Sequence, residues 1–322
     1  MKETILTLDE IRWVTSGAPI IENENGIFRF YKCTPKQTEA YYALSQGLGD
    51  RSLTTSGVRL DVVTDSKSVR FTPTGAGRYS VEMDGMLRRT VDVTDETAGD
   101  GVTLLLPAGE HRVTLWFPSH AVGSLSEFAL LGGTFFRPYR ARLRLLMLGD
   151  SITQGWNSGL DTEAYAPRLC RLLDAHSVIQ GIGGAFYHHS TFDPAVSFAP
   201  SLVTVAYGTN DFGHYNTVEE MAEEARQMLT AVKDTYGRRR IAVILPPPRF
   251  DKDQAPMGSF DECRRALADV AKELDLFTVD GYELVPQMEE MYADAVHPNA
   301  LGFSIMAERL AEILKKQFFF LN

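Results

Sequence analysis

Four short stretches of this 322-residue chain combine a group that could react with groups that could hold it in place. The first is Gly149-Asp150-Ser151, where a serine follows an apolar run, and the last is Asp294-Ala295-Val296-His297. A serine hydroxyl becomes a useful nucleophile when a neighbouring imidazole accepts its proton and a carboxylate fixes the tautomer of that imidazole. Ser151, His297 and Asp294 therefore suggest a serine nucleophile with its general base.

The two middle stretches carry hydrogen-bond donors. Gly181-Ile182-Gly183-Gly184 ends a second apolar run, and without side chains its backbone N–H groups can approach a ligand closely. Gly208-Thr209-Asn210-Asp211 ends a third run and offers the side-chain amide of Asn210. The backbone N–H of Ser151, at a strand-to-helix turn, could face the same substrate oxygen.

The second half of the chain is patterned to bring these stretches together. Apolar runs predict strands at residues 143–148, 177–182, 202–207, 241–245 and 277–279. Apolar residues at three- and four-residue spacing predict helices at residues 163–174, 218–236, 260–274 and 301–316. Alternating strands and helices predict a parallel sheet covered on both faces, with the reactive groups collected at the carboxyl ends of the strands.

The first half has a different pattern, from about Phe28 to Phe136. Short alternating segments predict strands at residues 58–63, 68–72, 78–83, 87–93, 102–106 and 112–117, and Asp84-Gly85 is a hairpin signal. No convincing amphipathic helix interrupts them. We therefore expect an all-β sandwich, a jelly roll, over residues 1–139 and the α/β domain over residues 140–322.

The four stretches, in this order, resemble the sequence blocks of the SGNH hydrolases, also called the GDSL-type esterases. The likeness covers Leu143 to about Lys316. It implies a three-layer α/β/α, flavodoxin-like fold with Ser151 as nucleophile, His297 as base and Asp294 as the carboxylate that orients the base.

The resemblance also implies an oxyanion hole made by the backbone N–H groups of Ser151 and Gly184 and the amide of Asn210. Gly181 and Gly183 are alternatives for the glycine. We favour Gly184 because the family's glycine follows the Ile-x pair.

A β-sandwich ahead of an SGNH domain resembles the two-domain carbohydrate acetylesterases, although the β-domain carries no specific motif. We therefore expect a serine ester hydrolase that removes short acyl groups, O-acetyl in particular, from a carbohydrate. A lipid or thioester hydrolase and a non-catalytic carbohydrate-binding protein of the same shape are alternatives. The complete set of Ser151, Asp294, His297 and Asn210 argues against the binding protein, which would not need it.

Three further residues lie near these motifs and are candidates for lining the substrate pocket: Trp156, Tyr187 and His188. Bulky and polar groups beside the acyl site would favour short acyl chains. His188, His189 and His214 could also suggest a metal site, but adjacent histidines point in different directions and no carboxylate or cysteine stands at ligand spacing. We expect neither a metal nor a cofactor.

Composition limits the partners. A net charge of −10 would repel nucleic acid and anionic membranes, and no window approaches the roughly 18 apolar residues of a membrane span. Cys33, Cys170 and Cys263 are too few and too widely spaced for a disulfide framework or a zinc cluster. The N-terminus lacks a signal-peptide pattern, so we expect a cytoplasmic protein, although a chain trimmed of its leader would look the same. Whether it forms a homo-oligomer stays open.

Overall fold

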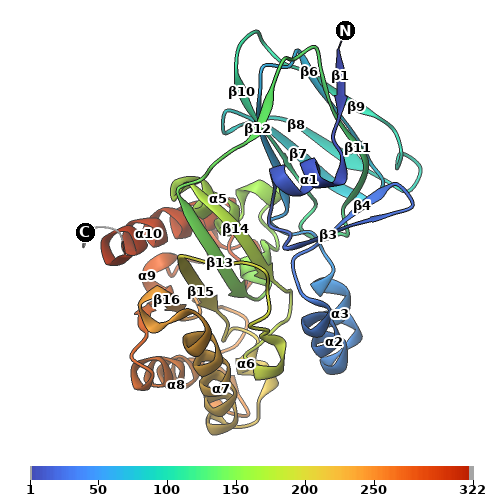
Figure 1. The fold of residues 1–322 in the computed structure, drawn as a ribbon. Coiled ribbons are helices and arrows are strands. Elements are labelled where there is room, and N and C mark those ends of the chain that lie inside the picture. Colours follow the sequence, from blue (N-terminus) through green and yellow to red (C-terminus); the bar gives the residue numbers. More distant parts are fainter. Residues whose placement is uncertain (1, 319–322) are drawn as a thin grey trace. The chain divides into compact units, whose positions relative to one another are not determined.

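The computed structural model describes residues 2–318 and divides the chain into two compact units (Figure 1). The first, which we call the β unit, comprises residues 1–33 and 53–141. The second, which we call the α/β unit, comprises residues 34–52 and 142–322. Residues 34–52 therefore belong with the second half of the chain, whereas the sequence prediction assigned them to the N-terminal domain.

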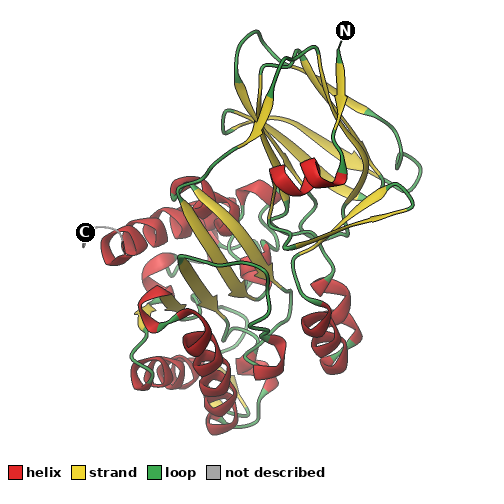
Figure 2. Cartoon of the chain, viewed as in Figure 1, coloured by secondary structure: helices red, strands yellow, loops and turns green. Residues whose placement is uncertain are grey.

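The β unit is built from antiparallel strands, as Figure 2 shows in yellow. Its strands are β1 (Glu3–Ile5), β2 (Thr15–Ser16), β3 (Ile20–Glu24), β4 (Ile27–Tyr31), β5 (Arg59–Thr64), β6 (Ser68–Pro73), β7 (Gly77–Met83), β8 (Met86–Val93), β9 (Val102–Leu105), β10 (His111–Trp116), β11 (Ser124–Leu131) and β12 (Phe136–Pro138). One sheet has the order β3-β4-β11-β6-β9, with β1 beside β11. Another has the order β12-β5-β10-β7-β8, with β2 beside β5.

Apolar side chains from both sheets form one core, which includes Leu60, Phe71, Tyr79, Leu115 and Phe128. Strands β5 to β10 lie at the six predicted segments. The predicted fold class is confirmed for this unit, while the jelly-roll connectivity stays a prediction.

The predicted hairpin at Asp84-Gly85 is present between β7 and β8. Met83 pairs with Met86 across the turn. Asp84 and Gly85 both have positive φ, 53° and 79°, as a tight hairpin turn between right-twisted strands requires.

The structure corrects the expectation that the first half of the chain lacks helices. It contains α1 (Leu8–Val14), α2 (Pro35–Leu44) and α3 (Gln46–Ser52). Helix α2 begins with a capping box, in which the Thr34 hydroxyl accepts the Gln37 N–H and the Gln37 side chain accepts the Thr34 N–H. Tyr41 is the one large apolar side chain that α2 buries, so no helical stripe appears in its sequence.

The α/β unit contains a parallel sheet. Its strands are β13 (Leu143–Gly149), β14 (Ala175–Gly181), β15 (Leu202–Ala206), β16 (Ile241–Ile244) and β19 (Phe277–Val279), in the order β14-β13-β15-β16-β19. This is the flavodoxin-like order 2-1-3-4-5. The five predicted strands and their parallel arrangement are confirmed.

Helices cover both faces of this sheet (Figure 1). They are α4 (Ser151–Gln154), α5 (Tyr165–Leu172), α6 (Asp211–His214), α7 (Val218–Tyr236), α8 (Phe260–Glu273), α9 (Gly281–Leu284) and α10 (Ala300–Phe318), and a small hairpin of β17 (Gln254–Ala255) and β18 (Gly258–Ser259) precedes α8. Leu145 and Met147 of β13 pack with α5 and α10 in one apolar core. Leu146, between them, points to the opposite face because successive strand side chains alternate.

The strand register sets the position of the motifs. Gly149 pairs with Gly181 on one side and with Ala206 on the other, so β13, β14 and β15 end level. The chain reverses its direction of winding between β13 and β15, which is where open α/β sheets bind their ligands. Three of the four predicted motifs therefore meet at one edge of the sheet.

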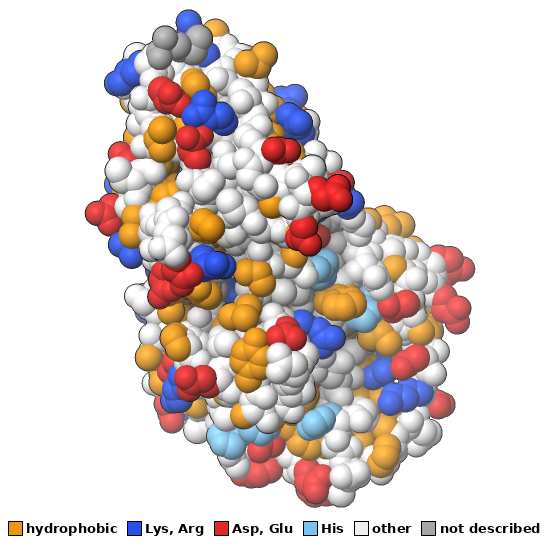
Figure 3. Space-filling view, turned by 90° about the vertical axis from the view of Figure 1, so that its right-hand side faces the viewer, with side chains coloured by type: hydrophobic (Ala, Val, Ile, Leu, Met, Phe, Trp, Pro, Cys, Tyr) orange, Lys and Arg blue, Asp and Glu red, His pale blue; other side chains and the backbone are white. Residues whose placement is uncertain are grey.

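Three observations bear on the expected partners. Within residues 2–318, no helix is both long and apolar enough to cross a bilayer. Cys33, Cys170 and Cys263 are buried, and none of them forms a disulfide. On the face shown in Figure 3, lysine and arginine side chains are interspersed with aspartate and glutamate side chains.

Candidate active site

Ser151 is the first residue of α4, and only Asp150 separates it from the end of β13. Asp150 caps this helix, and its Oδ1 accepts the N–H of Ile152 at 2.9 Å. A Cβ at Gly149 would overlap the Thr153 hydroxyl, so the tight strand-to-helix turn requires glycine there. The turn holds the Ser151 residue 6% exposed at the carboxyl edge of the sheet.

The structure brings Ser151, His297 and Asp294 together in a hydrogen-bonded chain. Ser151 Oγ lies 2.8 Å from His297 Nε2, and His297 Nδ1 lies 2.8 Å from Asp294 Oδ2. The imidazole can thus accept the serine proton on one nitrogen while its other N–H stays bonded to the carboxylate.

Asp294 is held by its own turn. Its Oδ1 accepts the backbone N–H groups of Val296 and His297, each at 2.7 Å. Partial burial acts to raise the pKa of Asp294, but these bonds and the imidazole outweigh it and hold the pKa below its ordinary value. The carboxylate therefore stays ionised while the imidazole accepts the proton of Ser151.

Asn157 completes the setting of Asp294 and was missed by the sequence analysis. Its Nδ2 donates to Asp294 Oδ2 at 2.7 Å. Asn157 has φ 62°, a left-handed conformation that asparagine tolerates better than most residues. The residue type could have indicated the turn, but not the contact with a carboxylate 137 positions away.

The glycines after β14 differ in what their N–H groups do. Gly181 lies within β14, where a Cβ would overlap the backbone of Gln154. The N–H of Gly183 donates to Gln154 Oε1 at 2.6 Å. Gly184 follows with φ 82°. The Gly183 N–H is therefore engaged within the protein, and the role of Gly184 as an oxyanion donor stays a prediction.

Asn210 lies four residues beyond the end of β15 and immediately before α6. Its Nδ2 donates one hydrogen bond to the Ala185 carbonyl at 2.9 Å. An amide nitrogen carries two N–H groups, so a second one is available for a substrate oxygen. The contact also fixes the plane of the amide.

Asp211 ties the second and third motifs together. Its carboxylate accepts the N–H of Tyr187 at 2.9 Å and the N–H of Gly208 at 2.8 Å. Burial raises the pKa of Asp211, and of the neighbouring buried Asp150, to about 7. The sequence alone assigns no role to Asp211.

The three predicted pocket residues lie in different environments. The Trp156 ring stacks beside the His297 ring, with centroids 6.2 Å apart. His188 is half-buried, and its Nδ1 contacts Ser190 Oγ at 2.8 Å. The Tyr187 side chain is 0% exposed and packs edge-on against Tyr207, so the expectation that Tyr187 lines the pocket is wrong.

A carboxylate does accompany the adjacent histidines in space, contrary to the sequence argument. His189 Nδ1 contacts Glu224 of α7 at 2.9 Å, and single ligand atoms of His188, His189 and Glu224 lie within 4.8 Å of one another. This contact could not be predicted from the sequence, because Glu224 lies on a separate helix. The absence of a functional metal stays a prediction.

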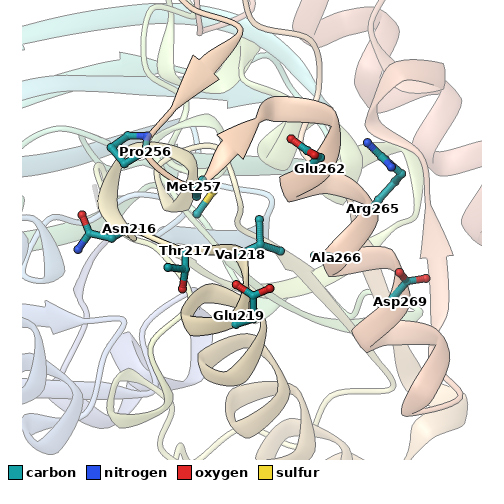
Figure 4. A pocket seen from close by; sticks show the side chains of 10 residues that line it. All are labelled: Asn216, Thr217, Val218, Glu219, Pro256, Met257, Glu262, Arg265, Ala266 and Asp269. Carbon is teal, nitrogen blue, oxygen red and sulfur yellow. The ribbon is translucent and has the colours of Figure 1, made fainter.

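A cavity of about 510 Å³ lies between the N-terminal turns of α7 and α8 (Figure 4). Its lining includes Asn216, Glu219, Glu262 and Arg265. None of the lining residues belongs to the hydrogen-bonded chain at Ser151, so this cavity is separate from the candidate catalytic groups.

Comparison with known proteins gives the same answer as the motifs. Residues 147–305 match the model of the GDSL-like Lipase/Acylhydrolase family. This segment belongs to that family. The resemblance expected from the four motifs is confirmed over this segment, and the expectation of an ester hydrolase is confirmed with it.

Two curated relatives are similar over much of the chain. A GDSL lipase of Mycobacterium tuberculosis is 25% identical over 205 residues, which are 56% of this chain and 87% of that protein. An acetylxylan esterase of Xylanibacter ruminicola is 23% identical over 257 residues, which are 68% of this chain and 53% of that protein. The chain thus spans about half the length of the acetylxylan esterase.

Solved structures share the fold of the whole chain. A salicylyl-acyltransferase from a tetracycline biosynthetic pathway has a TM-score of 0.78 at 22% identity, covering 94% of this chain and 93% of its own. A family two carbohydrate esterase from Cellvibrio japonicus has a TM-score of 0.71 at 16% identity, covering 100% and 99%. At these identities the likeness concerns the fold.

Proposed function

We propose that this esterase uses Ser151 as its nucleophile and removes short acyl groups, O-acetyl in particular, from carbohydrates. One observation carries the chemistry: Ser151 Oγ, His297 and Asp294 form a chain with contacts of 2.8 Å on each side of the imidazole. The carbohydrate substrate is supported by the acetylxylan esterase relative, about half of which the chain spans.

In the acylation half-reaction, Ser151 Oγ attacks the ester carbonyl carbon and its proton passes to His297 Nε2. The carbonyl electron pair moves onto the oxygen, where the N–H groups of Ser151 and Gly184 and the Asn210 amide stabilise the charge. Collapse of this intermediate breaks the bond to the sugar oxygen, which takes the proton from His297. The ionised Asp294 stabilises the transient imidazolium.

In the deacylation half-reaction, His297 takes a proton from water, and the resulting hydroxide attacks the acyl carbon. The bond between that carbon and Ser151 Oγ then breaks, and Oγ recovers the proton from His297. The products are the free carboxylic acid and the deacylated sugar. An alcohol in place of water would give acyl transfer by the same steps.

The preference for short acyl groups is supported by the side chains around the site. Trp156 stacks beside the base, with the ring centroids 6.2 Å apart. A long apolar groove would gain up to about 0.8 kcal/mol per methylene. A site closed by bulky rings cannot use that gain and meets a steric cost.

Acyl length is tested with para-nitrophenyl acetate, butyrate and octanoate. We expect kcat/KM for acetate to exceed that for octanoate by at least about tenfold. A rise toward octanoate would favour the lipid or thioester hydrolase. The ester of a simple phenol keeps this test independent of the sugar.

The substrate class is tested with a panel of acetylated oligosaccharides, by measuring acetate release and, in parallel, the transfer of acetyl to added alcohols. We expect hydrolysis of at least one acetylated sugar faster than para-nitrophenyl acetate. Ser151→Ala is the control for background release. Activity on simple esters with none on any acetylated sugar would contradict the carbohydrate assignment and leave the serine chemistry standing.

A further inference from the structure

We propose that Arg51 is a positioning residue of the oxyanion hole: its guanidinium binds the carbonyl end of the peptide whose N–H end belongs to Gly184. Arg51 lies on α3, in the segment of residues 34–52. In chain order this segment lies between β4 and β5 of the β unit, although it belongs to the α/β unit. The inference rests on the proposed serine chemistry and goes beyond it by assigning a function to this segment.

The central contact joins Arg51 Nη1 to the Gly183 carbonyl oxygen at 3.0 Å. That carbonyl and the N–H of Gly184 belong to one planar peptide unit. A cationic donor on the oxygen draws electron density from the peptide and strengthens the hydrogen bonds that its N–H makes. Arg51 therefore makes the Gly184 N–H a better donor to a developing oxyanion without touching the substrate.

The preceding peptide, which carries the N–H of Gly183, is also fixed. The Gly183 N–H donates to Gln154 Oε1 at 2.6 Å, and Trp156 Nε1 donates to the same oxygen at 3.2 Å. A Cβ at Gly183 would lie 2.8 Å from Trp156 Nε1. Gly183 is thus clamped between a neutral amide and a cation, which sets the direction of the Gly184 N–H.

The guanidinium also lies close to the rest of the site. A Cβ on Gly184 would be 3.2 Å from Arg51 Nη1. The Arg51 Cζ lies 5.8 Å from the centre of the Trp156 ring, and this ring stacks beside His297. A positive charge there favours the negatively charged tetrahedral intermediate over the neutral ester.

The segment of residues 34–52, which carries Arg51, is held against the rest of the α/β unit by buried polar contacts. The side-chain amides of Gln37 and Gln180 exchange two hydrogen bonds of 3.0 Å. The Thr34 hydroxyl donates to Asp193 at 2.6 Å. Gln180 immediately precedes Gly181 in β14, so the anchor lies next to the strand end that carries the glycines.

Three variants test the proposal with para-nitrophenyl acetate as the probe: Arg51→Ala, Arg51→Lys and Lys36→Ala. We expect Arg51→Ala to lower kcat by about 10- to 100-fold with KM changed by less than about twofold, because the contact acts in the transition state. Arg51→Lys should recover part of the loss, since an ammonium group can reach the same carbonyl. Lys36→Ala, which removes an exposed charge from α2 of the same segment, should behave as wild type.

A second readout separates positioning from structural damage. A boronic acid forms a tetrahedral adduct with an active-site serine and imitates the intermediate. Its inhibition constant should rise across the variants in proportion to the loss of kcat/KM, while the thermal midpoint stays within about 2 °C. If Arg51→Ala unfolds, the loss of kcat/KM and the boronate inhibition constant are compared in Arg51→Lys and Arg51→Met instead.

The proposal is overturned if Arg51→Ala keeps more than half of the wild-type kcat, if the loss is confined to KM, or if boronate affinity does not follow the loss of rate. The experiment distinguishes a failure of the proposed function from a failure of the role of Arg51. A wild-type protein that neither hydrolyses esters nor binds boronate contradicts both, whereas an active wild type with an unaffected Arg51→Ala contradicts only the role of Arg51.

Discussion

The site is held together in two different ways on its two sides. On the donor side, Ser151, Gly184 and Asn210 follow the ends of three paired strands, and sheet register fixes where they lie. On the base side, Asp294 and His297 lie in a loop well beyond β19 and ahead of α10. There, hydrogen bonds to the side chain of Asp294, rather than strand pairing, fix the position of the residues.

Electrostatics separates the two sides as well. Burial raises the pKa of Asp150 and Asp211, next to the donor motifs, to about 7. The exposed Asp294 has its pKa lowered by the bonds that it accepts. On the donor side, Asp150 and Asp211 accept backbone N–H groups and fix the turns. On the base side, Asp294 stays charged and orients the imidazole of His297.

The largest effect is expected from Ser151→Ala. Removal of the hydroxyl should lower kcat by at least about a thousandfold, because no other group can form the acyl bond. The thermal midpoint should be unchanged, since only one hydroxyl at the sheet edge is lost. A variant that keeps about a tenth of the activity would refute the assignment of the nucleophile.

Asn210→Ala should come next. One oxyanion donor is worth about 3 to 4 kcal/mol in the transition state, so kcat should fall by roughly 100- to 1000-fold with little change in KM. Steady-state kinetics on para-nitrophenyl acetate measures both constants. A change in KM alone would make Asn210 a contact to the ground-state substrate and would break the description of the donor side.

Asn157→Ala probes the base side. It removes one hydrogen bond to Asp294, worth about 1 kcal/mol, so kcat should fall by about fivefold. Asn216→Ala, at an exposed asparagine away from the triad, is the matched control. Equal rates in the two variants would show that Asp294 is held sufficiently by its own turn.

The opposite pKa shifts predict a pH dependence of stability on the donor side. The pKa of Asp211 is about 7 in the folded chain and near its ordinary, lower value in the unfolded chain. Between those values the folded state binds more protons, so the free energy of unfolding should fall as pH rises toward 7.

Urea unfolding of the wild type and Asp211→Asn at pH 5 and pH 7 measures this effect. The slope of stability with pH should be smaller in the variant. An unchanged slope would mean that Asp211 is ionised in the folded state throughout this range.

The smallest effect is expected from metal removal. Dialysis against EDTA should leave kcat/KM unchanged, because the proposed steps use only Ser151, His297 and Asp294 with the oxyanion donors. Activity lost in EDTA and restored by zinc would contradict this account and direct attention to His188, His189 and Glu224.

The two sides also differ in how well the sequence predicted them. The strands of the parallel sheet were predictable because long apolar runs alternate with helical periodicity, and Ser151 and Asn210 each lie within three residues of the end of such a run. The Asp294–His297 pair was recognisable because its spacing is local. What holds these residues was less visible: Asn157 and Arg51 act through contacts 137 and 132 positions apart in sequence.

Two predictions were wrong, and the sequence contains a signal that would have corrected the first of them. Thr34-Pro35-Lys36-Gln37 is a capping-box sequence with proline at the first helical position, and it marks the start of α2. Tyr187 was misjudged because sequence neighbours of a motif were assumed to face the pocket. Its side chain packs inward while its backbone N–H bonds to Asp211.

The most direct test of the central claim is covalent labelling by a fluorophosphonate, which reacts with activated serine hydroxyls. Peptide mass spectrometry should find the adduct on Ser151, and His297→Ala should abolish labelling because the hydroxyl then lacks its base. Inactivation should follow the extent of labelling. An adduct on another serine that accounts for the loss of activity, or full activity after complete modification of Ser151, would contradict the account.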